Sequence, residues 1–150
     1  MGADETEWSC LFVAGISSRS FCRSSGVIFG LGTDIIETRR IEKLISRGTA
    51  YLQTIFTPTE IEYCESKKWK SQHYAARFAA KEATLKALRI GWSNGAAFCD
   101  VEVVDDNEGR PHVQVHGKVK ELFERHGIQH TSISLSHTDQ NAIAVIILET

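Results

Sequence analysis

A long stretch without glycine or proline, Tyr74 to Leu88, places the strongest constraint on the fold of this chain. It is rich in Ala, Leu, Lys and Glu, which favour helix formation, so it predicts one long helix. At about 100° per residue, Phe78, Glu82 and Leu85 share a face, and Lys86 follows Glu82 by one turn. An acid and a base are thus expected inside an apolar stripe, where charges need a partner or a metal. The alternative is an ordinary surface pair, worth about 0.2–0.5 kcal/mol.

Shorter elements are expected on both sides of this helix. Thr57 to Glu60 has the form of a capping box, with Pro58 at the first helical position. After Gly95, apolar and polar residues alternate between clear turn signals, which is typical of antiparallel hairpins. The expected helices cover residues 38–47, 58–66, 74–88 and 117–126, and the strands cover 27–36, 98–115 as one hairpin, 131–136 and 142–148. This order predicts an α+β fold, a mostly antiparallel sheet with the long helix packed on one face.

Composition and charge narrow the class of protein. The chain has 150 residues, 42% of them hydrophobic and 24% charged, which suits one domain at residues 27–150. Residues 1–26 lack periodicity and are expected to be a disordered or atypical N-terminal extension. Acids within the first seven residues argue against an organellar transit peptide. A net charge of −2 offers no case for nucleic acid, and no apolar run is long enough to span a membrane. Four cysteines without a metal or disulfide spacing favour a reduced, cytoplasmic protein.

Four charged or titratable residues stand out from this background. Asp34 interrupts an apolar run, where the alternative to a functional role is a helix cap or a turn. Arg77 and Lys81 are a cationic pair at i,i+4, which is mildly unfavourable unless an anion is bound; a solvated surface is the alternative. His137 begins a turn after a strand, where it can reach a ligand or simply support the turn.

Four motifs, read in order, carry a resemblance to a known family. They are Gly32-Thr33-Asp34-Ile35, then Arg77-Phe78-Ala79-Ala80-Lys81-Glu82-Ala83 followed by Lys86, then Asn107-Glu108-Gly109-Arg110-Pro111, and Ser134-Leu135-Ser136-His137-Thr138. Over about residues 27–148 the chain resembles the 4′-phosphopantetheinyl transferases of the small holo-[acyl-carrier-protein] synthase type. The resemblance implies the 4′-phosphopantetheinyl transferase fold.

The resemblance also implies an activity. Such enzymes move 4′-phosphopantetheine from coenzyme A to a serine of an apo acyl carrier protein, release adenosine 3′,5′-bisphosphate and support fatty acid biosynthesis. Asp34 and Glu82 are the expected Mg²⁺ ligands, since Mg²⁺ takes one or two carboxylates plus substrate phosphates and water. These two acids and Lys86 are the expected catalytic residues. Arg77, Lys81, Lys86 and His137 are expected to bind coenzyme A. The serine proton goes either to Glu82 or to a metal-bound water.

Partners follow from the same resemblance. A homotrimer with active sites at subunit interfaces is expected. An acidic carrier protein is expected to dock on Arg39, Arg40 and Lys43, with the cluster Lys67, Lys68 and Lys70 as the second choice. Two alternatives remain at this point: a non-catalytic module that binds coenzyme A or a carrier protein, and the same chemistry on a polyketide or peptide synthetase carrier.

Overall fold

The computed structural model describes residues 26–91 and 95–150. Apart from Gly26, the expected N-terminal extension at residues 1–26 lies outside the described residues. The division of the chain into that extension and a domain at 27–150 therefore stays a prediction. Within the described ranges, no helix has the length and apolar character needed to cross a membrane.

Strands and helices follow the expected α+β order, and the antiparallel sheet is confirmed. β1, β5 and β4 form a three-stranded antiparallel sheet with β5 in the centre, while β2 and β3 form a separate hairpin. The central place of β5 suits its almost continuously apolar sequence. In chain order the elements are β1 (Ile28–Glu37), α1 (Thr38–Ile45), α2 (Thr49–Leu52), α3 (Pro58–Glu65), α4 (Lys70–Ala87), the 3₁₀ turn η2 (Phe98–Asp100), β2 (Val101–Asp105), β3 (Pro111–Val115), α5 (Gly117–His126), β4 (His130–His137) and β5 (Asn141–Glu149).

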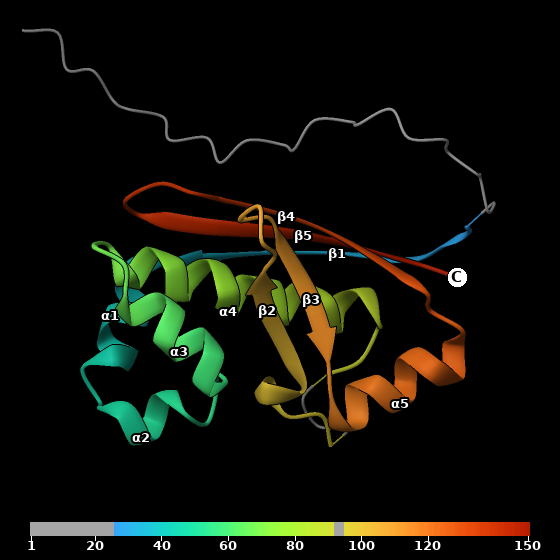
Figure 1. Cartoon of the computed structure of the whole chain (residues 1–150), viewed down its shortest axis with the longest axis horizontal. Helices are drawn as coiled ribbons and strands as arrows, with labels where there is room; N and C mark the ends of the chain where they lie inside the picture. The colour runs from blue at the N-terminus through green and yellow to red at the C-terminus, as the bar shows by residue number, and fades with distance from the viewer. Residues whose placement is uncertain (1–25, 92–94) are drawn as a thin grey trace, which may run out of the picture.

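Helix α4 is the centre of the molecule. Figure 1 shows the three-stranded sheet as one layer against α4, with α1 to α3 and the hairpin on the other sides of the helix. Where α4 packs on the sheet, it offers small buried side chains such as Ala79, Ala80 and Ala83, and β5 contributes Ala144 and Ile146 to the same core. Small residues let the sheet approach the helix closely, so polar groups on β1 and α4 can meet.

Two glycines make the closest approach of β1 to α4. A Cβ added at Gly30 would overlap the backbone carbonyl of Ala87, and one at Gly32 would overlap that of Ala83. Any larger residue would force the strand away from the helix. This close approach sets the position of Asp34, two residues further along β1.

Of the two alternatives for Glu82 and Lys86, burial inside the apolar stripe does not hold. The buried charges of α4 are Arg77, 3% exposed, and Lys81, 0% exposed, whereas Glu82 is half-buried and Lys86 is exposed. The sheet covers one side of the helix, and α3 and β2 cover the side that carries Lys81. Phe78, Glu82 and Lys86, each one turn apart, form the strip of α4 that remains partly open.

Candidate active site

Asp34 and Lys86 meet where β1 crosses α4. Asp34 points towards the helix, on the same strand face as the buried Gly32 and Ile36. The Nζ atom of Lys86 lies 2.7 Å from Oδ1 of Asp34 and donates a hydrogen bond to the carbonyl oxygen of Thr33 at 3.1 Å. The side chain of Asp34 is 15% exposed and that of Lys86 is 52% exposed, so the pair is open to solvent on the lysine side. Two residues far apart in sequence are thus in direct contact.

Glu82 lies one turn before Lys86, on the partly open strip of α4. The contact of Gly32 with Ala83 brings β1 alongside the turn of the helix that carries Glu82. Among residues 26–91 and 95–150, no cluster of three or more His, Cys, Asp or Glu could hold a metal ion. A cation here would have at most two protein carboxylates, which fits Mg²⁺, because Mg²⁺ usually takes its other ligands from substrate phosphates and water.

A cavity of about 620 Å³ opens near the opposite edge of the sheet. Its walls come from α3, the N-terminal half of α4, the turn between β2 and β3, and β4. Two of the expected coenzyme A residues, Arg77 and His137, line it, and Gly109 to Pro111 of the third motif form its rim. The four sequence motifs are therefore combined in two places: the first and second at the crossing of β1 and α4, and the second, third and fourth at this cavity.

Arg77 is built into the cavity wall. Its guanidinium carbon lies 3.7 Å from the centroid of the Tyr63 ring, and Nη2 lies 3.4 Å from Oδ1 of Asp105. Its Nε has no hydrogen-bond partner among the described residues. Buried donors are normally satisfied, so this side chain retains capacity for an acceptor. Burial and the nearby Asp105 raise the pKa of Tyr63, which keeps the phenol neutral.

Two histidines face each other in the same cavity. The ring centroids of His73 and His137 are 5.9 Å apart in a T-shaped arrangement, and His73 also meets the edge of Tyr63 at 5.7 Å. Burial, followed by the positive charge of Arg77 and by His137, lowers the pKa of His73 to about 4. Sequence reasoning missed His73, because the predicted helix began one residue later, at Tyr74; the four-residue spacing of His73 from Arg77 was the signal that could have found it.

Lys81 does not line the cavity. Its side chain is fully buried, and Nζ lies 2.7 Å from Oε2 of Glu60, also fully buried. It also donates to the carbonyl oxygens of Phe98, at 3.1 Å, and of Val101. Burial lowers the pKa of Lys81, and Glu60 opposes that effect. The ammonium group of Lys81, which was expected to bind coenzyme A, is therefore paired with Glu60 inside the protein.

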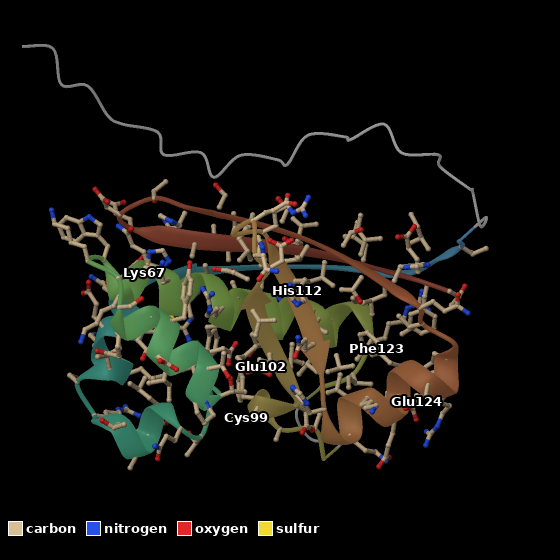
Figure 2. The ribbon with its side chains drawn as sticks, in the orientation of Figure 1. Lys67, Cys99, Glu102, His112, Phe123 and Glu124 are labelled. Atoms are coloured by element: carbon tan, nitrogen blue, oxygen red, sulfur yellow. The ribbon has the colours of Figure 1, made fainter. Side chains whose placement is uncertain are left out.

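The buried pair continues into a hydrogen-bond network. Glu60 completes the predicted capping box with Thr57, and its Oε1 accepts from the backbone N–H of Val103 at 3.0 Å. Thr57 donates to Glu102 at 2.6 Å, and His116 lies 2.9 Å from the other oxygen of that carboxylate. Figure 2 shows Glu102 on the hairpin beside the helices. The network therefore joins α3, α4 and β2, and it supports the helix that carries Glu82 and Lys86.

The basic residues of α1 are exposed. Arg39, Arg40 and Lys43 lie on the outer side of the helix, while Ile41 is buried at 1% exposure. Arg39 is in an ion pair with Glu37 at 3.2 Å. Since α1 starts directly after β1, this basic surface begins within five residues of Asp34.

Comparisons with known proteins show which family this sequence matches. A model of the 4′-phosphopantetheinyl transferase superfamily matches residues 30–146. A holo-[acyl-carrier-protein] synthase of Geobacter sp. (strain M21) is 47% identical over 124 residues, which cover 82% of this chain and 99% of that protein.

Solved structures give the same answer for the fold. The holo-[acyl-carrier-protein] synthase of Neisseria meningitidis matches with a TM-score of 0.75 and 30% identity, over 83% of this chain and 100% of that one. The Helicobacter pylori synthase in complex with coenzyme A matches with a TM-score of 0.69 and 34% identity, over 79% of this chain and 98% of that one.

Proposed function

The chain belongs to the 4′-phosphopantetheinyl transferase superfamily, and we propose that it transfers 4′-phosphopantetheine from coenzyme A to a serine of an apo acyl carrier protein. The products are the holo carrier protein and adenosine 3′,5′-bisphosphate, and the reaction supports fatty acid biosynthesis. The observation that carries the proposal is the contact of Asp34 with Lys86 beside Glu82. A module that only binds coenzyme A could keep the basic residues but would not need the two carboxylates, Asp34 and Glu82.

Asp34 and Glu82 are the residues that would hold Mg²⁺. The ion, when bound, neutralises charge on the diphosphate, which is the main requirement of phosphoryl transfer. Lys86 is placed to offset charge on the leaving phosphate or to donate a proton to it. Glu82 is the chain's own candidate for the base that accepts the serine proton as the new O–P bond forms.

The cavity would hold the nucleotide end of coenzyme A. Arg77, with an unpaired buried Nε, and His137 are suited to a phosphate monoester, which carries about −1.5 to −2 charge near neutral pH. Lys81 is not part of this proposed set, because its ammonium is paired with Glu60 and has no exposed surface. Its proposed role is to hold α3 and β2 on α4.

A single assay tests the proposed function. The protein is incubated with coenzyme A, Mg²⁺ and an apo acyl carrier protein, and the carrier is weighed by mass spectrometry. The expected result is a gain of one phosphopantetheine arm, abolished by a chelator and restored by Mg²⁺ or Mn²⁺. A carrier that stays unmodified under all these conditions would overturn the proposal.

The exposed basic surface of α1 is the proposed docking site for the acidic carrier protein. Exposed charges mainly steer the encounter, and salt screens them over about 8–10 Å. The double variant Arg39→Glu and Arg40→Glu should raise KM for the carrier several-fold and flatten its salt dependence. KM for coenzyme A should change much less. The matched control is Lys120→Glu with Arg125→Glu, a charge reversal on the exposed side of α5; equal effects of the two double variants would contradict docking on α1.

A homotrimer is proposed from the uncovered face of the sheet. Leu31 and Ile35 of β1 are 59% and 65% exposed, and Ile143 of β5, which pairs with Ile35, is 39% exposed. These residues alternate with the buried residues of their strands and so lie on the face of the sheet away from α4. Figure 1 shows no labelled helix or strand beyond that face of the sheet. Contiguous apolar surface of this kind favours association. Asp34 and His137 lie on the two opposite edge strands, so neighbouring subunits of a closed ring could bring the two half-sites together.

Lysine substitutions on this face test the assembly. The double variant Leu31→Lys and Ile35→Lys should shift the mass measured by light scattering from trimer to monomer and lower activity with it, because charges cannot be buried unpaired in an interface. Tyr51→Lys, at a 41% exposed residue of α2, is the matched control and should leave both unchanged. A wild-type protein that is monomeric and fully active would exclude the trimer.

A further inference from the structure

His73 is a cavity residue that no part of the proposed mechanism uses. It projects from the first turns of α4 between Tyr63 of α3 and His137 of β4, at ring distances of 5.7 and 5.9 Å. The same end of α4 is joined to the turn after β4 by a 3.0 Å hydrogen bond from Gln72 to Asp139. His73 is therefore held in place at the wall that Arg77 and His137 share.

The charges around His73 are mostly positive. Arg77 of α4, Lys67 after α3 and His137 of β4 act against a second positive charge on its imidazole, and Asp105 of β2 is the acid that favours it. Burial adds to the effect, so that the pKa of His73 is lowered to about 4. His73 is thus a neutral imidazole at neutral pH.

We infer that His73 is a further coenzyme A-binding residue, whose imidazole takes up a proton when a phosphate monoester binds beside Arg77 and His137. The inference rests on the proposed function, because it needs coenzyme A in this cavity. The proton comes from solvent and bonds to the unprotonated ring nitrogen, and no other bond is made or broken. The bound anion reverses the sign of the local field, and a charged imidazole then donates to a phosphate oxygen.

The sign of the pH dependence follows from this change. In the free protein His73 holds no proton between pH 8 and pH 6.5, whereas in the complex it gains one progressively over this range, so binding takes up protons. Affinity for coenzyme A should therefore rise as pH falls from about 8 to about 6.5, the ordinary pKa of imidazole. Below that range the phosphate begins to gain its own second proton, near pH 6, and the trend weakens.

Calorimetry of coenzyme A binding in two buffers of different ionisation enthalpy measures this uptake directly. We expect the wild-type protein to take up a fraction of a proton per coenzyme A at about pH 6.5. In His73→Gln the uptake should fall, and the dissociation constant should rise about threefold to tenfold at this pH but change little near pH 8. Dephospho-coenzyme A, which lacks the 3′-phosphate, should show no uptake that depends on His73.

Two controls keep the result specific. His130→Gln removes an exposed imidazole of β4 that does not line the cavity, and it should leave uptake and affinity unchanged. His73→Phe keeps an aromatic ring against Tyr63 and should reproduce the effect of glutamine. If both His73 variants bind coenzyme A with wild-type proton uptake, the inference fails while the proposed function stands. If the wild-type protein does not bind coenzyme A, the proposed function itself fails.

Discussion

Replacing Lys86 by alanine is expected to lower kcat by about 10²–10⁴-fold, the usual effect of removing a group that transfers a proton in the transition state. The pair with Asp34 is 2.7 Å long, but the lysine side chain is 52% exposed, so the fold should tolerate its loss. KM for coenzyme A should change far less than kcat, because the lost interaction is made chiefly with charge that develops on the leaving phosphate. Steady-state kinetics with an apo carrier protein and thermal unfolding together measure both effects.

Two further variants sharpen the test of Lys86. Lys86→Arg should recover little of the rate, because arginine is larger and effectively keeps its proton. Lys118→Ala is the matched control: it removes another lysine paired with an acid, here Glu121 at 2.7 Å on α5, and should keep the wild-type rate. A wild-type kcat in Lys86→Ala would exclude the catalytic role.

Replacing Lys81 by methionine is expected to destabilise the protein by about 3–5 kcal/mol, since it leaves the Glu60 carboxylate buried without its partner. This is a large share of the roughly 5–15 kcal/mol that stabilises a domain of this kind. Methionine keeps most of the volume of lysine, so the loss would reflect charge rather than a cavity. Urea unfolding followed by circular dichroism gives the free energy of unfolding.

A double-mutant cycle measures how much of this loss of stability comes from the interaction between Lys81 and Glu60. The combination Lys81→Met with Glu60→Gln should cost less than the sum of the two single variants, because no unpaired charge remains. Lys120→Met, at an exposed position of α5, should change stability by less than about 0.5 kcal/mol. If Lys81→Met alone is as stable as the wild type, the ion pair does not hold α3 and β2 on α4.

Local sequence was sufficient to predict those elements whose backbone conformation depends on interactions between residues close together in the chain. The capping box at Thr57 was predicted because its two hydrogen bonds join residues only three apart, and the structure contains both. The hairpin of β2 and β3 followed from alternation and a dense turn signal. The short helix α2 was missed, and α4 begins at Lys70 rather than Tyr74. Neither α2 nor α4 begins with a side-chain capping hydrogen bond, so no capping motif in the sequence marked where these helices start.

The sequence predicted which residues belong to the candidate site better than it predicted how they are arranged. The four motifs named Asp34, Glu82, Lys86, Arg77 and His137, and the structure brings Asp34 to Lys86 and Arg77 to the cavity of His137. The sequence also grouped Lys81 with Arg77, since i,i+4 spacing places both on one helix face. It could not show that Glu60, 21 residues away, would neutralise Lys81 and leave Arg77 with an unpaired donor.

By itself, the sequence determined the order of elements, the α+β class and the family, because propensity, alternation and motif spacing are properties of the chain. Only the tertiary structure decided which side of α4 is open. Almost every side of this alanine-rich helix is apolar enough to be buried, so its hydrophobic pattern cannot select one. The choice depends on the close approach of β1 at Gly32 and on the pairing of Lys81 with Glu60 on the other side. These long-range contacts leave Glu82 and Lys86 on the strip that remains accessible to a substrate.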